Sequence, residues 1–127
     1  MRFQVEINLP IKKHLIKEEK MSTKTKVLKT SRSFRIWIEG VKLMENGFTP
    51  NTRFDIKYES DSIRLVLNES GKRKVSNSAR NGEPRPIIDI ESKRVGLFAD
   101  AGTELIVYYF KTQIQIKKVE SQKLVHH

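Results

Sequence analysis

Hydrophobic residues recur at every second position in a stretch of the first half of the chain. In FRIWIE, Phe34, Ile36 and Ile38 fall on one face, which is the period of a half-buried strand. The next segment, VKLMENGF, predicts one or two helical turns, and Gly47 suits the left-handed position that ends a helix. TPNT then predicts a turn, and RFDIKYE and SIRLVL predict a hairpin. Residues 34–70 are therefore expected to form a strand, a short helix, a turn and a hairpin.

The same order of elements recurs in residues 86–119. A strand around Ile88 and Ile90 precedes a short helix at 93–98, the turn DAGT, and a hairpin formed by ELIVYYF and IQIKK. A shift of 51 residues superposes the hairpins, and a shift of 52 superposes the strands ahead of the turn. The hairpin pairs are Thr52 with Thr103, Phe54 with Leu105, Ile56 with Val107, Tyr58 with Tyr109, Ile63 with Ile114 and Leu65 with Ile116. The chain is therefore predicted to be mainly β, with two strand–helix–hairpin repeats around one pseudo-twofold core.

The expected core follows from the inward positions of these strands. The residues predicted to be buried are Ile36, Ile38, Phe54, Ile56, Ile63, Leu65, Ile88, Ile90, Val107 and Ile116.

The remaining segments are polar or basic. The predicted divisions are 1–33 as an N-terminal strand, short helix and basic linker, 34–70 as repeat 1, 71–85 as a basic connector, 86–119 as repeat 2 and 120–127 as a tail. RFQVEINL predicts a strand that ends at Pro10, and IKKHLIKEEK predicts a short helix. MSTKTKVLKTSRS shows no period and is interpreted as a mobile linker. Met21 followed by a serine fits a translation start, which would make residues 1–20 an upstream extension, and KLVHH fits a purification-tag remnant.

Composition narrows the class of protein. The chain has 127 residues, which suits one domain, and it has no cysteine, which excludes disulfides and thiolate metal sites. No apolar run approaches the roughly 20 residues of a membrane span, and the N-terminus lacks the layout of a signal peptide. We therefore expect a cytoplasmic protein without a membrane partner.

The net charge of +10 is concentrated outside the repeats. Residues 1–35 carry a net +7 and residues 71–85 a net +4, whereas 36–70 carry −2 and 86–127 carry +1. Lysine and arginine on flexible segments can follow phosphates and release counterions, so the pattern predicts polyanion binding. The predicted nucleic-acid-binding residues are Lys72, Arg73, Lys74, Arg80 and Arg85 on the connector, with Lys24, Lys26, Lys29, Arg32 and Arg35 on the arm.

Candidate catalytic and metal-binding residues are few. The only histidines are His14, His126 and His127, which cannot provide a zinc-ligand spacing, and there is no phosphate-binding loop or nucleophile elbow. The acid pairs Asp55 with Glu59 and Asp89 with Glu91 fit solvent-facing strand positions better than a metal-dependent nuclease. We therefore predict no catalytic residues, no metal and no cofactor.

Two apolar features need a covering surface. In ELIVYYF, residues 105–110 are apolar on both faces, so either the N-terminal strand and helix or a second chain is expected to cover this strand. The second case would be a homodimer through the 105–110 strand. Trp37 faces away from Ile36 and Ile38, and packing at the rim of the core is favoured over stacking on a base.

The segment LMENGFTPNTRFDIKYESDSIRLVL resembles the AbrB-type swapped-hairpin superfamily, and most closely its SymE-like branch. The resemblance covers residues 34–67 well and 86–118 more loosely, where Asp100 stands in place of Phe48. It implies two hairpins that interlock into one swapped-hairpin-like β-barrel domain. It also implies a small DNA-binding regulator or a toxin–antitoxin component, since the SymE-like branch includes toxins that act on nucleic acid.

The leading hypothesis is therefore a small basic nucleic-acid-binding protein without catalysis of its own, with DNA favoured over RNA. One alternative is a SymE-like toxin that cleaves RNA. The other is an inhibitor encoded by a phage or mobile element, which would bind a host or cognate protein complex that processes nucleic acid.

Overall fold

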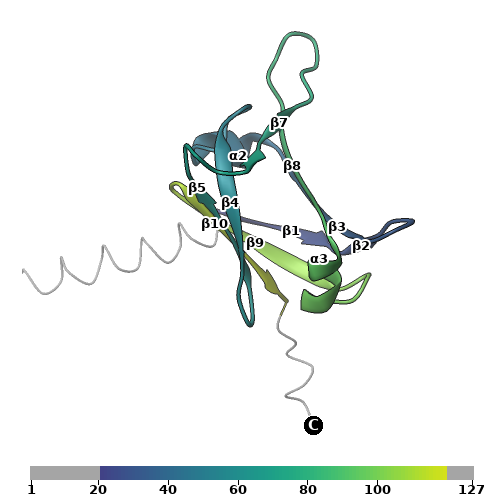
Figure 1. Ribbon diagram of the computed structural model, residues 1–127. Coiled ribbons are helices and arrows are strands. Elements are labelled where there is room, and N and C mark those ends of the chain that lie inside the picture. Colours follow the sequence, from purple (N-terminus) through teal and green to yellow (C-terminus); the bar gives the residue numbers. More distant parts are fainter. Residues whose placement is uncertain (1–20, 120–127) are drawn as a thin grey trace, which may run out of the picture.

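The computed structural model describes residues 21–119, which form a mainly β structure with two short helices (Figure 1). The predicted strand and helix within residues 1–20, and the tail at 120–127, lie outside the described residues. The elements are β1 (Ser22–Lys26), β2 (Leu28–Lys29), β3 (Phe34–Glu39), α2 (Val41–Glu45), β4 (Arg53–Tyr58), β5 (Ile63–Leu67), β6 (Arg73–Lys74), β7 (Ser76–Asn77), β8 (Pro86–Glu91), α3 (Lys93–Phe98), β9 (Glu104–Phe110) and β10 (Gln113–Lys118).

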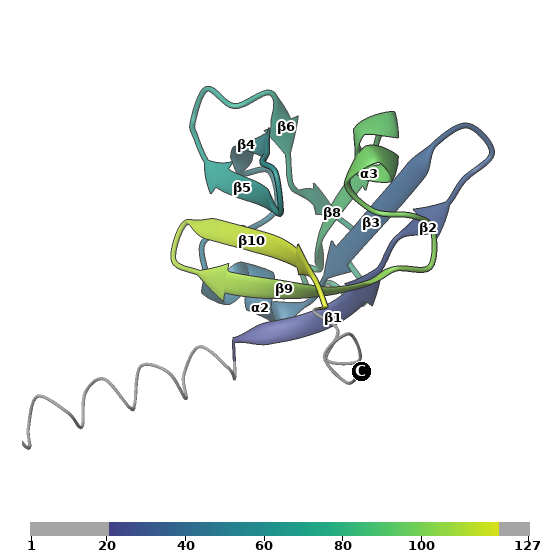
Figure 2. The ribbon, with the colours of Figure 1, turned by 90° about the horizontal axis from the view of Figure 1, so that it is seen from below.

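The described strands divide between two sheets. The first has six strands in the order β1-β9-β10-β5-β4-β6, and the second has four in the order β2-β3-β8-β7. Every pairing is antiparallel, and Figure 2 shows β9 and β10 side by side with β1 along the edge of β9. The predicted class, mainly β with short helices and strand–helix–hairpin order, is thus observed within both 34–70 and 86–119.

The predicted closed barrel is not formed by the described strands. The chain leaves the six-stranded sheet for the four-stranded sheet at two buried residues, Val27 between β1 and β2 and Val75 between β6 and β7. The backbone groups of these valines bind turns rather than a neighbouring strand. The hydrogen-bond ladder is therefore interrupted at both places, and two separate sheets result.

The register relates the two halves of the chain. In the centre of the four-stranded sheet, β3 pairs with β8 so that Ile36 lies opposite Ile90 and Ile38 opposite Ile88. Under the shift of 52 residues, Ile36 corresponds to Ile88 and Ile38 corresponds to Ile90, so each of these two pairs corresponds to the other. In the six-stranded sheet, Ile63 lies opposite Ile116 and Leu65 opposite Ile114, and a shift of 51 exchanges these pairs in the same way. Corresponding strands of the two halves therefore pair with one another.

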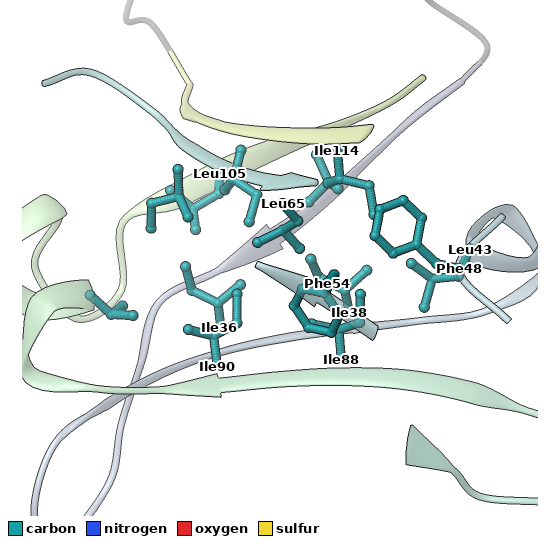
Figure 3. Close-up of a cluster of buried hydrophobic side chains, with 14 of the residues drawn as sticks. Ile36, Ile38, Leu43, Phe48, Phe54, Leu65, Ile88, Ile90, Leu105 and Ile114 are labelled. Carbon is teal, nitrogen blue, oxygen red and sulfur yellow. The ribbon is translucent and has the colours of Figure 1, made fainter. Parts of the chain in front are cut away.

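The core lies between the two sheets (Figure 3). Nine of the ten residues predicted to be buried are buried, and the exception, Ile56, is partly buried and packs against the others. Phe48 joins the core from the turn after α2, with its ring centroid 6.1 Å from that of Phe54 in an edge-to-face arrangement. Burial of these side chains is the main source of stability in a domain of this size.

Residues 21–33 are not the irregular linker that their composition predicted. Ser22–Lys26 forms β1, which pairs with β9, and Leu28–Lys29 forms β2, which pairs with β3. An edge strand has one hydrogen-bonded neighbour and does not need an apolar face, and exposed lysines suit such an edge. The absence of hydrophobic alternation was therefore no argument against a strand.

The connector at 71–85 is also more structured than predicted. Gly71 is buried so closely against Phe54 that a β-carbon would lie 2.5 Å from the Phe54 carbonyl oxygen. β6 and β7 follow, and the chain then projects from the sheets as a loop between β7 and β8 (Figure 1). At its tip, Arg80 and Glu83 exchange both backbone hydrogen bonds around Asn81 and Gly82, whose φ angles are both positive. That is the two-residue hairpin turn for which Asn-Gly is the strongest signal.

Candidate nucleic-acid interface

One face of the six-stranded sheet packs against the core, and the opposite face points away from it. The register settles which side chains share the outward face, because directly opposite residues in antiparallel strands point the same way. Residues such as Leu105 and Val107 in β9 are buried, so their neighbours Ile106 and Tyr108 face outward. We call this outward surface the outer face. Its residues are Lys24, Lys26, Arg53, Asp55, Lys57, Arg64, Val66, Lys74, Glu104, Ile106, Tyr108, Phe110, Gln113, Gln115 and Lys117.

The outer face is strongly basic. The set contains seven lysines and arginines against two acids, Asp55 and Glu104. Asp55 accepts a hydrogen bond from the Asn68 amide nitrogen at 2.6 Å. The positive side chains extend from β1 at one edge of the sheet to β6 at the other. An excess of basic side chains on one face is the electrostatic footprint expected of a polyanion-binding site.

Most of these basic side chains have no acidic partner within residues 21–119. Among the seven, only Arg64 forms an ion pair in that range, with the Glu59 carboxylate. That hydrogen bond is the main reason why the pKa of Glu59 lies below its usual value. Arg64 also donates through Nη1 to Gln113 Oε1 on β10 at 3.3 Å. The other six form no ion pair within residues 21–119, and one of them, Arg53, donates through Nη1 to the Gly71 carbonyl oxygen at 3.0 Å.

A row of apolar side chains runs through the middle of this basic surface. Ile106, Tyr108 and Phe110 are all partly exposed on β9. The next strand places Gln115 opposite Tyr108 and Gln113 opposite Phe110. Aromatic rings and amides in a basic surround can stack on bases and hydrogen-bond their edges, while the cations contact phosphate.

The structure brings three of the ten predicted binding residues onto the outer face. Lys24 and Lys26 lie on β1, and Lys74 lies on β6 opposite Arg53. Lys72 is exposed just before β6. Arg73 is paired with Phe54, so it points toward the other side of the sheet.

The other predicted residues lie elsewhere. Lys29 is exposed on β2, with Nζ 5.0 Å from the centroid of the Phe34 ring, and Arg32 is exposed in the loop before β3. Arg80 is exposed on the loop between β7 and β8. The ten residues therefore do not form one patch.

Two predicted residues are already occupied by acids. Arg35 donates through Nε to Asp89 at 2.9 Å and through Nη2 to Glu91 at 3.5 Å. Arg85 Nη2 lies 3.3 Å from the Glu39 carboxylate. Contact with phosphate would require each guanidinium to leave a carboxylate, so these positions are poor candidates for a nucleic-acid contact.

The outward face of the four-stranded sheet has a different character. Trp37 is 36% exposed there, its indole nitrogen donates to Glu39 Oε1 at 3.1 Å, and the Arg35 guanidinium lies 5.8 Å from its ring centroid. The prediction that Trp37 packs at the rim of the core is therefore wrong. Its strand alternates strictly, and the core takes only the opposite face, with Ile36 and Ile38. The acids around Trp37 make this face unsuited to phosphate.

Both edges of β9 are paired, one with β1 and the other with β10. A homodimer formed by pairing along the edge of the 105–110 strand is therefore closed off, and only its outer face could meet another chain. The core covers the inward side chains of this strand, Leu105, Val107 and Tyr109. Only its outer face is left for a covering segment or a second chain.

Sequence reasoning missed several residues of the outer face. Arg53 and Lys57 are the outward positions of RFDIKYE, and Lys117 is the outward position of IQIKK. The alternation that identifies the inward residues also identifies these, but in the sequence they look like ordinary solvent-facing positions. Tyr108 and Phe110 stand out there only as an apolar face in need of cover.

Neither a metal centre nor a membrane-spanning helix occurs in the described part of the chain. Within residues 21–119 there is no group of three or more histidine, cysteine, aspartate or glutamate side chains that could hold a metal ion. No helix in that range is long and apolar enough to cross a bilayer. In comparisons with protein-family models, curated proteins and solved structures, no match to the chain was found.

Proposed function

We propose that this protein is a small nucleic-acid-binding module that uses the outer face of its six-stranded sheet. One observation supports the proposal above all others. Six basic side chains without an acidic partner in the described range surround a row of partly exposed apolar and aromatic side chains on one sheet face. Nucleic acid offers phosphates to the first group and base faces to the second.

The charge distribution supports phosphate contacts rather than a merely soluble surface. Lys24 and Lys26 on one edge and Lys74 on the other are long side chains with ammonium groups that can follow a backbone across the sheet. Each phosphate neutralised releases condensed counterions, which gives affinity and a steep dependence on salt. Arginines already paired with acids, as on the four-stranded sheet, could not contribute in this way without first leaving their partners.

The same proposal includes the architecture. The chain would be an internal tandem repeat of an AbrB-type, SymE-like unit, in which two copies within one chain interlock. The register supports this, because corresponding strands pair with one another in the centre of each sheet. The regulatory or toxin–antitoxin role implied by that resemblance remains part of the proposal, with DNA favoured over RNA.

A binding titration tests the proposed function. Fluorescence anisotropy would be measured with labelled DNA and RNA, single-stranded and duplex, at two salt concentrations. The variant with Lys24, Lys26 and Lys74 all replaced by Gln should bind more weakly to every sequence alike. Its salt slope on duplex DNA should fall by about 0.9 for each phosphate that the variant no longer neutralises.

A matched variant controls for net charge. Lys29, Arg32 and Lys93 are also exposed and basic but lie outside the outer face, and their joint replacement by Gln removes the same charge. It should leave affinity and slope close to those of the wild type. Equal reductions in both variants would contradict a role for the outer face, and absence of any binding would contradict the proposed function. RNA recovered intact from the same mixtures would argue against the RNA-cleaving alternative.

A further inference from the structure

Tyr108 and Phe110 occupy successive positions on the outer face of β9. Two residues apart along a strand, their Cα atoms are about 6.7 Å apart. Both rings are partly exposed, as are Gln115 and Gln113, which lie opposite them on β10. The centre of the outer face is therefore a platform of two rings beside two amides, each of which can donate and accept hydrogen bonds.

The other tyrosine of this strand shows the contrast. Tyr109 points inward and is 3% exposed, and its hydroxyl shares a hydrogen bond of 2.9 Å with Thr23 Oγ1. Its position is explained by packing and by that bond. Tyr108 instead points outward and is partly exposed, and its hydroxyl makes no comparable hydrogen bond within residues 21–119.

A duplex cannot use such a platform. In a double helix each base face is covered by its neighbours, and successive nucleotides rise by about 3.4 Å along a strand, half the spacing of the two rings. Stacking of a base on each ring requires bases that are unpaired and separated from one another. Single-stranded nucleic acid meets this requirement, and aromatic platforms beside a positive groove are how such strands are bound without sequence preference.

The cations are placed to hold the backbone of that strand. Lys24 lies on β1 opposite Ile106, and Lys117 lies opposite Ile106 from the other side, on β10. Positive side chains therefore stand on both sides of the apolar row. A strand running along β9 with its bases on the rings would have its phosphates within reach of these ammonium groups.

We propose that the outer face binds single-stranded nucleic acid, with Tyr108 and Phe110 stacking on successive unpaired bases. This inference rests on the proposed nucleic-acid binding and narrows it to one class of ligand. DNA and RNA single strands offer the same phosphates and base faces, and they differ in the 2′-hydroxyl, which Gln113 and Gln115 could contact.

The wild-type protein gives the first test. Poly-dT and poly-U oligonucleotides and a DNA duplex of equal length would be titrated at one salt concentration. Binding to at least one single strand should be about tenfold tighter than to the duplex, because only the single strand can stack on the rings. Equal or tighter duplex binding would overturn the stacking inference while leaving the proposed function in place. Absence of binding to all three would overturn both.

Substitutions of the rings give the second test. Tyr108→Leu and Phe110→Leu should each weaken single-strand binding by roughly fivefold to a hundredfold, the range seen when a stacking ring is removed. Tyr108→Phe keeps the ring and should retain wild-type affinity. Duplex affinity and the salt slope should be unchanged in all three variants, because the phosphate contacts remain. Unchanged single-strand affinity in both leucine variants would contradict the inference.

Photocross-linking tests the contact without any substitution. A single strand carrying thiothymidine would be cross-linked to the wild-type protein and the protein digested with trypsin. The expected cross-linked peptide spans residues 95–111 and contains both rings. Attachment to the peptide 36–42, which contains Trp37, would place the strand on the other sheet and overturn the inference.

A second copy of the chain is the competing occupant of this face. Sedimentation of the wild type and of Tyr108→Leu separates the two. A monomeric wild type is expected. A dimer that dissociates on Tyr108→Leu, with nucleic-acid binding unaffected, would make the ring platform a dimer interface and end the proposal.

Discussion

Val27 and Val75 make the same pair of backbone hydrogen bonds in the two halves of the chain. The Val27 N–H donates to the Thr103 carbonyl at 3.0 Å, and the Val75 N–H donates to the Thr52 carbonyl at 2.9 Å. The Val27 carbonyl accepts from the Gly102 N–H, and the Val75 carbonyl accepts from the Asn51 N–H, both at 2.8 Å. Gly102 and Asn51 each precede the threonine of their turn, and both have a positive φ. The two valines are both 1% exposed. Each is the point at which the chain crosses from one sheet to the other.

The sequences around the two valines also correspond. KTKVLK at 24–29 and KRKVSN at 72–77 align on the two valines, with a shift of 48 residues. β1 and β6 directly precede these valines, and they are the two edge strands of the six-stranded sheet. Lys24 and Lys26 on β1 and Lys74 on β6 therefore lie at opposite edges of one face.

Replacement of either crossover valine by alanine should destabilise the protein. Val27→Ala or Val75→Ala removes two buried carbon atoms at a place where two sheets meet, which should cost about 1.5–3 kcal/mol of unfolding free energy. Urea denaturation followed by circular dichroism measures the change. Because the two sites correspond, the two reductions should agree within about 1 kcal/mol.

Val41→Ala is the matched control for those variants. Val41 is 65% exposed on α2, so the same chemical change should alter stability by no more than about 0.5 kcal/mol. Reductions at Val27 and Val75 no larger than that of the control would mean that the crossovers are not packed as the structure shows.

Gly71→Ala should be destabilising for a different reason. The added β-carbon would meet backbone atoms of Phe54, with the carbonyl oxygen at 2.5 Å, and backbone cannot move aside as a side chain can. A decrease of about 1–3 kcal/mol in the unfolding free energy is expected, the usual range for overpacking. Ser70→Ala, at the exposed neighbouring position, should have little effect. Equal stability of the two variants would contradict the close approach of the connector to β4.

The sequence predicted the inward-facing residues of the hairpins, and it did not predict the edge strands. Ile36, Ile63 and Ile116 were predicted correctly because a sheet with one buried face imposes a strict period of two. β1 and β6 lie at sheet edges and carry mostly polar residues, so they lack that signal. The loop after β7 is four residues longer than the loop after β2, so the shift that aligns the two halves changes from 48 residues before the loops to 52 after them.

The candidate site was harder to predict, because it depends on which strands become neighbours. Lys24 and Lys117 lie far apart in sequence and stand on either side of β9 only through its pairings with β1 and β10. Charge density along the chain instead singled out Arg35 and Arg85, which the folded chain pairs with acids. The turn at Asn81 and Gly82, by contrast, has an explicit signal in the Asn-Gly dipeptide, which the prediction of a flexible connector did not use.

Tyr109 should make stability fall at alkaline pH. Burial raises its pKa above the usual value near 10, and the hydrogen bond with Thr23 offsets this only in part. Above that pH the unfolded chain loses the phenolic proton while the folded chain keeps it, so the folded state binds more protons. The contribution of Tyr109 to the unfolding free energy should therefore be fully present below about pH 10, and it should be lost as the pH rises through the folded pKa.

The variant Tyr109→Phe isolates that contribution. Its unfolding free energy, measured in urea between about pH 8 and pH 11, should decline less steeply than that of the wild type. Identical alkaline slopes for Tyr109→Phe and the wild type would show that the buried hydroxyl does not contribute.

The two edge strands should contribute equally to nucleic-acid binding if they are one repeated element. Lys24 and Lys26 on β1 correspond to Lys72 and Lys74 at β6, and all four are exposed. Replacing either pair by Gln should lower the salt slope on single-stranded DNA by up to about 1.4, which is two phosphates at about 0.7 each. The pairs lie at opposite edges of the sheet, so replacing both should add the two reductions.

Replacing Arg80 and Arg85 by Gln should change the slope less, because Arg85 is already paired with Glu39. Anisotropy titrations at three salt concentrations give the slopes of the wild type and of the four variants. If the arginine pair on the loop reduced the slope more than either lysine pair, the contact surface would lie on the β7–β8 loop and not on the outer face.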